Sequence, residues 1–385
     1  VYYNGEEISN SFLEYLLVFK ISNSYVGDSM QINYFDTNLK RHVSYEEIIS
    51  NYPQQFNLYK RNIISFIMRI KCNNHSLNDI KNYFVLNLKY KEEIRYKNKC
   101  FLIIVLDIYS RYMEELHSVL GIDFDDMLSI SKHLVEERGM YHNYKYIIID
   151  EFQDTSFVRY QLIHAIQVKT KARVMCVGDD YQSIYHFSGC DINIFLNFTK
   201  YIPNSQIKKL KYTYRNSQEL IDISSKFVMK NKSQIKKKLL SHKHLDKPIE
   251  FIYYINPYKC FKELYNKLKK ENNDLLILGR NNFDINKFSK EEIKEFMSVH
   301  SSKGLEAENV ILINLTDGLY GFPNKIINSK LIEELHPSDK TYLYAEERRL
   351  FYVALTRTKN KVYILVPFFN KSIFIKELKK IMRFK

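Results

Sequence analysis

The chain has 385 residues, of which 45% are hydrophobic and 15% aromatic, so it has room for more than one domain and is too apolar to be intrinsically disordered. Its formal net charge of +14 favours a polyanionic partner, although a lysine-rich surface without any partner gives the same balance. The five cysteines show no metal-site spacing, and no signal peptide or membrane-spanning run is recognisable, so we expect a cytoplasmic protein with reduced thiols and no membrane partner.

Residues 1–115 are rich in Tyr, Asn, Lys and Ile and poor in Gly and Pro. Apolar residues recur at helical spacing over 58–70 and 101–116, so we predict a mostly helical region. It contains no combination of residues that is typical of a catalytic site.

Between residues 116 and 205 the predicted elements alternate between helix and strand. They are an amphipathic helix between Asp123 and Gly139, a strand over 145–150, a helix over 156–168, a strand over 173–178 and a helix from about Asp191. This alternation predicts an α/β fold with a parallel sheet. The β-branched run of Ile147, Ile148 and Ile149 suggests a buried central strand.

The first of these strands ends in paired carboxylates, Asp150 and Glu151. The carboxyl end of a parallel strand is where α/β sheets place their ligand chemistry. In a nucleotide hydrolase the first carboxylate holds Mg²⁺ and the second polarises water. Taken alone, a strand followed by an acidic helix N-cap has the same appearance.

Residues 206–385 again alternate, which predicts a second α/β domain. The predicted strands are 249–255, 274–279, 295–300, 309–314 and 361–367, and the predicted helices include 217–229, 258–271 and 345–355.

Several segments, in order along the chain, resemble the motifs of UvrD/Rep-type superfamily 1 DNA helicases. They are KYIIIDEFQDT from residue 145, VGDDYQSIYHFSG from 177, YTYR from 212, SVHSSKGLE from 298 and YAEERRLFYVALTRTKNKVYIL from 344. The second and last of these are most similar to the helicase IV-like branch. The resemblance extends from about residue 123 to 367.

The resemblance implies two RecA-like motor domains of the P-loop NTPase fold. Residues 116–205 then form the second half of the first motor domain, and residues 206–385 form the second. Residues 1–115 correspond to a helical insertion that helps line the DNA path, to a remnant of the first motor domain, or to a plain packing module. The interval between Arg215 and His300 has no room for the large extra subdomain of many such helicases.

The P-loop pattern GxxxxGK[ST] occurs nowhere in the sequence, and the first residue is Val1. In P-loop enzymes this loop holds the phosphates through backbone N–H groups and a lysine. We therefore expect the chain alone to be inactive. It is a fragment of a longer helicase, one subunit of a split helicase whose partner polypeptide supplies the P-loop, or a helicase-derived nucleic-acid-binding protein without ATP hydrolysis.

For the nucleotide, the resemblance implies ATP with Mg²⁺. Asp150 would bind the metal and Glu151 would orient the attacking water. Gln182 would sense the γ-phosphate, because an amide both donates to phosphate and accepts from water. Arg215 and Arg357 would reach the γ-phosphate from the second domain, where guanidinium groups stabilise its charge. The presence of all these residues favours a fragment or a split enzyme over an inactive relative.

Two further residues have weaker assignments. Tyr214 would stack on the adenine, but the sequence has 31 tyrosines and a core tyrosine is a real alternative. Glu306 would contact the ribose or the region of the phosphates and the metal, and a plain acid at a helix terminus is the alternative.

For DNA, the resemblance implies contacts from Tyr185, Phe187, His300 and Lys303, because single-strand binders stack bases on aromatic rings and follow the backbone with cations. Phe187 stands where the family usually has tryptophan, and the chain has none. The lysines within 229–243 would contact phosphates or form a solvated face. The implied function is an ATP-dependent 3′–5′ DNA helicase on single strands and single–double-strand junctions, with DNA repair among its possible settings.

Overall fold

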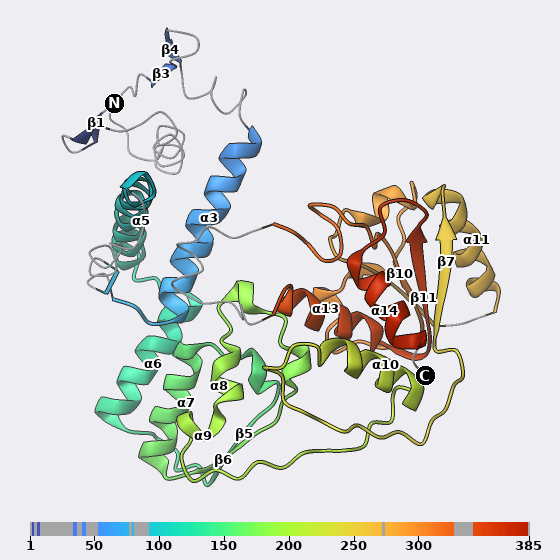
Figure 1. Ribbon diagram of the computed structural model, residues 1–385. Helices are drawn as coiled ribbons and strands as arrows, with labels where there is room; N and C mark the ends of the chain where they lie inside the picture. Colours follow the sequence, from blue (N-terminus) through green and yellow to red (C-terminus); the bar gives the residue numbers. More distant parts are fainter. Residues whose placement is uncertain are drawn as a thin grey trace.

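The computed structural model describes residues 2–3, 6–7, 34–36, 41–43, 53–76, 79–80, 92–271, 274–326 and 342–383. Figure 1 shows a helical part near the N-terminus, a small α/β unit and a larger α/β unit. Much of the region 1–115 lies outside the described residues. The short strands described there are β1 (Tyr2–Tyr3), β2 (Glu6–Glu7), β3 (Tyr34–Asp36) and β4 (Arg41–Val43).

Among the described residues of the helical part are two long helices, α3 (Pro53–Cys72) and α5 (Glu92–Ser118), which confirms both helices predicted in this region. Phe66 of α3 and Phe101 of α5 are buried and meet edge to face, with ring centroids 5.3 Å apart. These apolar contacts explain why the two helices associate, since packing of an apolar face is the main source of helix stability in proteins.

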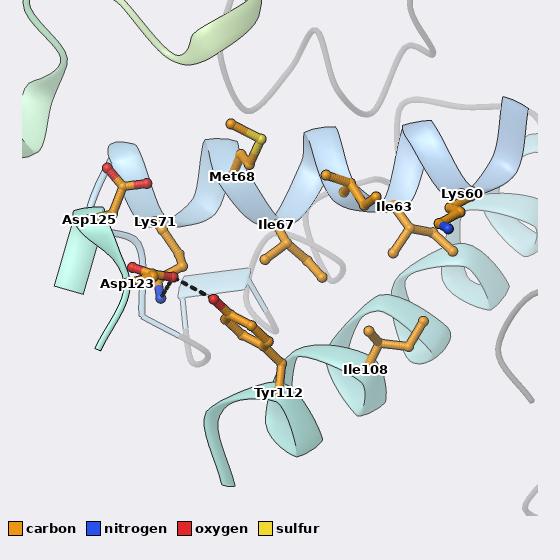
Figure 2. A pocket seen from close by; sticks show the side chains of 10 residues that line it. Lys60, Ile63, Ile67, Met68, Lys71, Ile108, Tyr112, Asp123 and Asp125 are labelled. Atoms are coloured by element: carbon orange, nitrogen blue, oxygen red, sulfur yellow. Dashed lines mark hydrogen bonds and ion pairs between the residues drawn. The ribbon is translucent and has the colours of Figure 1, made fainter. Parts of the chain in front are cut away.

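A cavity of about 300 Å³ lies between α3, α5 and the start of α6 (Phe124–Arg138). Figure 2 shows that isoleucine side chains line its length, whereas Lys71, Tyr112 and Asp123 meet at one end. The ammonium group of Lys71 pairs with Asp123 and, at 2.8 Å, with Asp126. The same two aspartates form the capping box that begins α6, so the polar end of the cavity joins α3 to α6.

The first α/β unit, which comprises α6 to α9, contains a two-stranded parallel sheet. Its further elements agree with the prediction in order and type, and β5 and β6 pair in register from Tyr146 with Arg173 to Ile149 with Cys176. They are β5 (Tyr146–Ile149), α7 (Phe157–Thr170), β6 (Arg173–Cys176), α8 (Ile192–Leu196) and α9 (Phe198–Tyr201).

The expectation that β5 is a central strand buried on both faces is wrong for this chain. The side chains of Tyr146 and Ile148 are 65% and 72% exposed, and that of Met175 on β6 is 58% exposed. Successive side chains of a strand point to opposite faces. In the part of the chain that the structure describes, only the face with Ile147 and Ile149 is partly covered.

The second α/β unit, which comprises α10 to α14, contains a five-stranded parallel sheet in the order β7-β11-β10-β8-β9. All five predicted strands and the three predicted helices are present, which confirms the α/β fold class. The strands are β7 (Ile249–Tyr254), β8 (Leu275–Gly279), β9 (Phe296–Ser298), β10 (Ala307–Leu312) and β11 (Thr358–Pro367). The helices are α10 (Gln218–Val228), α11 (Pro257–Lys270), α13 (Ala345–Leu355) and α14 (Ile373–Arg383).

Helices cover both faces of this sheet, as near-continuous apolar strands require. Side chains of α10, α13 and α14, such as Phe227, Phe351 and Phe374, form one core with the sheet. Phe261 and Leu264 of α11 form the core on the other face. No helix among the described residues is long and apolar enough to span a bilayer.

The two α/β units meet where the loop after β6 contacts α13 and the loop after β9. The guanidinium of Arg349 donates to the carbonyl of Ser183 over 2.6 Å. The ring of Tyr181 meets that of Tyr352 edge to face at 5.2 Å. These contacts bring the motif segments of both units to one interface.

Candidate nucleotide and DNA site between the two units

The acidic pair follows β5 at the carboxyl end of the small sheet. Both side chains are exposed, and Asp150 Oδ1 accepts a hydrogen bond from the backbone N–H of Glu151 over 2.8 Å. The backbone of Glu151 is left-handed, with φ of 49°, which is uncommon for a residue with a side chain and often marks a functional turn. This conformation turns the Glu151 carboxylate toward Gln153, which donates to it.

Lys303 comes from the loop after β9 and enters the first unit, where its side chain is only 8% exposed. Its ammonium group pairs with Asp154, donates to the carbonyl of Gln182 over 3.0 Å and lies 3.4 Å from Glu151. Burial raises the pKa of Asp154, although Lys303 partly offsets this. A DNA contact by Lys303, as predicted, would require the ammonium to leave these carboxylates.

Gln182 and Arg357, predicted to reach the same phosphate from different domains, contact each other. Arg357 Nη2 donates to Gln182 Oε1 over 3.1 Å, and its other nitrogens donate to the carbonyls of Val353 and Leu305. Arg357 is 2% exposed. Burial, followed by the nearby charge of Arg215, lowers its pKa to about 10, so it remains a cation at neutral pH.

Arg215 and Glu306 also lie together, within the second unit. Arg215 Nε donates to Glu306 Oε2 over 2.6 Å, and Lys359 lies 3.2 Å from the other carboxylate oxygen. The hydrogen bond from Arg215 and that from Lys359 hold the pKa of Glu306 below its usual value. Arg215 and Lys359 share the single carboxylate of Glu306, so this group carries a net positive charge that suits an anion.

Tyr214 precedes this pair, and its side chain is 85% exposed. The alternative of a core tyrosine is therefore wrong. An exposed ring beside the arginine site can stack on a planar ligand, but the described contacts give it no ring partner.

The predicted DNA residues Tyr185, Phe187 and His300 form one aromatic cluster across the interface. Phe187 and His300 meet edge to face at 5.3 Å, and Tyr185 lies 6.0 Å from Phe187. The hydroxyl of Tyr185 donates to the carbonyl of His300 over 2.9 Å. The ring of Phe187 is 53% exposed, which leaves it accessible to a base. Burial, followed by the charge of Arg280, lowers the pKa of His300 to about 4, so its ring is neutral near pH 7.

The lysine-rich stretch 229–243 is not uniform. Lys232, Lys236 and Lys238 are exposed, in agreement with a solvated face. Lys230 instead pairs with Glu377 at 2.7 Å, and Lys237 pairs with Asp179 and Asp180. Sequence reasoning did not single out these two aspartates or Asp154, although all three lie inside the quoted motifs.

Sequence reasoning also missed exposed aromatic residues at the carboxyl ends of the strands of the larger sheet. Because all five strands are parallel, the segments after β8, β10 and β11 share one edge with His300, which follows β9. Phe283 and Tyr320 meet there at 5.8 Å, and Phe368 and Phe369 meet at 5.2 Å. All four are about half exposed or more. Their position after predicted strands was the signal that could have identified them.

Two family models match the sequence. The model of the UvrD/REP helicase N-terminal domain matches residues 20–203, and the model of the UvrD-like helicase C-terminal domain matches residues 258–367. These segments contain most of the site residues described above. Outside them lie the segment from Tyr212 to Arg215, the stretch 229–243, Phe368, Phe369 and Glu377.

Curated relatives carry helicase names. DNA helicase IV of Escherichia coli is 30% identical over 270 residues, which are 68% of this chain and 39% of that protein. The ATP-dependent DNA helicase PcrA of Leuconostoc citreum is 28% identical over 157 residues, 40% of this chain and 21% of that protein. The probable DNA helicase II homolog of Mycoplasma capricolum is 31% identical over 147 residues, 37% of this chain and 20% of that protein.

The matched segment thus spans well under half the length of each of these relatives. The two family models nevertheless follow each other in order and together account for about three quarters of the chain. The motif segments of both models meet at one interface in the structure. The chain therefore belongs to the UvrD-like family of DNA helicases.

Proposed function

We propose that this chain is part of an ATP-dependent helicase that moves in the 3′–5′ direction on single-stranded DNA. The observation that carries the proposal is the interface between the two α/β units. There Gln182 of the first unit accepts from Arg357 of the second, and Tyr185 donates to the loop that carries His300. Residues suited to a nucleotide and residues suited to bases therefore depend on the same contact between units.

For the nucleotide, the side chains present fit ATP with Mg²⁺. Asp150 is an exposed carboxylate at a strand end, the kind of oxygen ligand that Mg²⁺ takes together with phosphates and water. Glu151 follows it directly in the chain, and its exposed carboxylate would orient a water molecule. Arg357 and Arg215 offer guanidinium groups to phosphate oxygens, and Gln182 offers its amide. Bound ATP would bring negatively charged phosphates to these arginines.

For DNA, the cluster of Tyr185, Phe187 and His300 offers faces and edges on which bases stack. Lys303 connects this cluster to the acids, because its ammonium lies 5.3 Å from the centroid of Tyr185 and pairs with Asp154. A change in the separation of the two units would alter both sites together. We infer that the two units close around ATP and that this closure changes their contacts with single-stranded DNA.

The proposed ATP hydrolysis requires a P-loop from polypeptide other than these 385 residues, because they contain no GxxxxGK[ST] pattern. Within the ranges that the structure describes, apolar side chains on β5 and β6 are exposed, among them Ile148 at 72% and Met175 at 58%. This exposure supports a further layer packing over the sheet. Further strands of the same polypeptide or a separate partner would both fit. The second candidate function, nucleic-acid binding without ATP hydrolysis, is favoured only by the missing GxxxxGK[ST] pattern.

Binding of a labelled single-stranded oligonucleotide, followed by fluorescence anisotropy, tests the DNA part of the proposal on the chain itself. Phe187→Ala is expected to weaken binding by about 1–3 kcal/mol, the contribution of one stacked base. Tyr141→Ala serves as the matched control, since Tyr141 is a 97% exposed aromatic on the loop after α6. Equal affinity of the two variants, or equal binding of duplex and single strand, would argue against the proposed DNA surface.

A further inference from the structure

Lys237 lies in the lysine-rich stretch between α10 and β7, yet its side chain is only 16% exposed. Its ammonium pairs with Asp179 and Asp180 and lies 4.2 Å from the centroid of the Tyr181 ring. The neighbouring Lys236 and Lys238 are exposed. The site described above does not use this largely covered cation, although all three of these contacts are with the loop that carries Gln182.

The backbone around Lys237 is also fixed to that loop. The N–H of Ile235 donates to Asp180 Oδ2 over 2.8 Å, and the hydroxyl of Tyr181 donates to the carbonyl of Ile235 over 3.0 Å. Asp180 is fully buried, and burial raises its pKa in spite of the charge of Lys237. Burial also lowers the pKa of Lys237, but the two carboxylates outweigh it and the pKa lies above its ordinary value. The lysine is therefore a cation at neutral pH.

Asp179 also contacts Gln182. Its Oδ2 accepts a hydrogen bond from Gln182 Nε2 over 2.8 Å. A carboxylate only accepts and a guanidinium only donates. Since Gln182 lies between Asp179 and Arg357, its NH₂ group must face Asp179 and its carbonyl oxygen must face Arg357. Donor and acceptor chemistry thus assigns the amide orientation, which coordinates alone often leave open.

We propose that Lys237 is a positioning residue for Gln182: by holding the Asp179 carboxylate, it determines which way the Gln182 amide faces. Without the cation, Asp179 Oδ1 would keep the backbone N–H of Tyr181 as a partner but lose its ion pair with Lys237. The carboxylate would then be free to turn Oδ2 away from the amide that donates to it. Arg357 would then lose the oriented oxygen. The relevance to phosphate sensing rests on the proposed function, whereas the orientation of Gln182 is a property of this chain by itself.

The test follows the side-chain amide of Gln182 by nuclear magnetic resonance in the chain labelled with ¹⁵N-glutamine, with Gln182→Asn used for assignment. In Lys237→Met the Gln182 signal is expected to shift. Exchange of its amide protons with water is expected to accelerate by about tenfold or more, the effect of one lost charge-assisted hydrogen bond. Lys238→Met, which removes an exposed lysine next to it, is expected to leave the signal unchanged.

An unchanged Gln182 signal in folded Lys237→Met would overturn the proposal, and so would equal changes in both variants. If Lys237→Met does not fold, Lys237→Arg and Asp179→Asn decide the matter: the signal is expected to be preserved in the first and shifted in the second. An unchanged signal in Asp179→Asn would then refute the role. The experiment uses neither nucleotide nor DNA. Its outcome therefore tests the role of Lys237 even if the helicase proposal fails.

Discussion

The backbone of Glu151 has a left-handed conformation, which few residues other than glycine adopt. Its φ of 49° costs roughly 1–3 kcal/mol and persists only because the surroundings enforce it. The hydrogen bond between the Glu151 N–H and Asp150, together with the packing of the buried Phe152 that follows, hold it there. A conformation of this kind suits a carboxylate that must face a ligand.

Replacing Glu151 by glutamine tests its assigned role directly. Glutamine keeps the shape and one acceptor oxygen but cannot take up a proton or orient water as a carboxylate does. In a form of the protein that contains a P-loop, we expect ATP turnover to be abolished and the affinity for single-stranded DNA to be unchanged. Turnover equal to that of the parent protein would remove Glu151 from this role.

His300 predicts a pH dependence of stability. Its pKa is about 4 in the folded chain and 6.5 when unperturbed. Between these values the unfolded state binds more protons, so the free energy of unfolding is expected to fall as the pH drops from 6.5 to 4, by up to about 3 kcal/mol. Above pH 6.5 this contribution is fully present.

Urea denaturation at a series of pH values measures the effect. The variant His300→Gln is expected to lack this part of the pH dependence. The control variant His142→Gln, at an exposed histidine, is expected to retain it. The same pH profile for His300→Gln and the parent protein would show that His300 is not the group responsible.

Contacts between distant residues could be predicted from the sequence only where a motif implies a shared ligand. Gln182 and Arg357 were both expected at one phosphate, and they lie in contact. Lys303 was predicted to contact DNA, but its side chain is 8% exposed and pairs with Asp154, 149 positions away in the sequence. Burial of a long cationic side chain depends on how two units dock, and no local pattern in the sequence reports this. The same holds for Lys237.

At the scale of elements, β-branched runs and helical spacing predicted the strands and helices of both α/β units. The failure concerns β5, whose residues Tyr146 and Ile148 are exposed. The sequence of a strand shows that it suits a buried sheet, but the extent of burial depends on how many strands and helices share that sheet. The aromatic residues after β8, β10 and β11 were missed because loops carry no periodicity.

The contact between α3 and the loop that bears Phe187 is also expected to be sensitive to substitution. Gly189 ends the short 3₁₀ turn of residues 186–188 with a φ of 88°, and an added Cβ would collide with Sγ of Cys72. Gly139 has a φ of 77° but nothing within 4 Å of an added Cβ. We expect Gly189→Ala to lower the free energy of unfolding by about 1–3 kcal/mol more than Gly139→Ala does.

Chemical denaturation of the two variants gives this difference. The double variant Cys72→Ala with Gly189→Ala is expected to recover part of the loss, because it removes the colliding sulfur atom. Equal losses for the two glycine variants would mean that backbone strain alone decides and that α3 does not restrict the loop.

At the scale of the whole molecule, loops that follow strands of two separate sheets meet at one interface. Arg349 and Tyr352 of the second unit contact the loop after β6 of the first. Gln182 with Arg357 and the aromatic cluster lie along that contact, which is why we infer that the sites proposed for nucleotide and DNA work together. The division of the chain at residues 115 and 205 stays a prediction, and so does the role of the helical part.

The measurement that tests the central claim most directly is ATP hydrolysis by the native protein from its source cells, with and without single-stranded DNA. The intact mass of the same preparation is compared with the 46.3 kDa of this chain. We predict hydrolysis stimulated by single-stranded DNA in material that contains a P-loop, within a longer polypeptide or in a partner. Absence of DNA-stimulated hydrolysis in a P-loop-containing preparation that binds DNA would contradict the account.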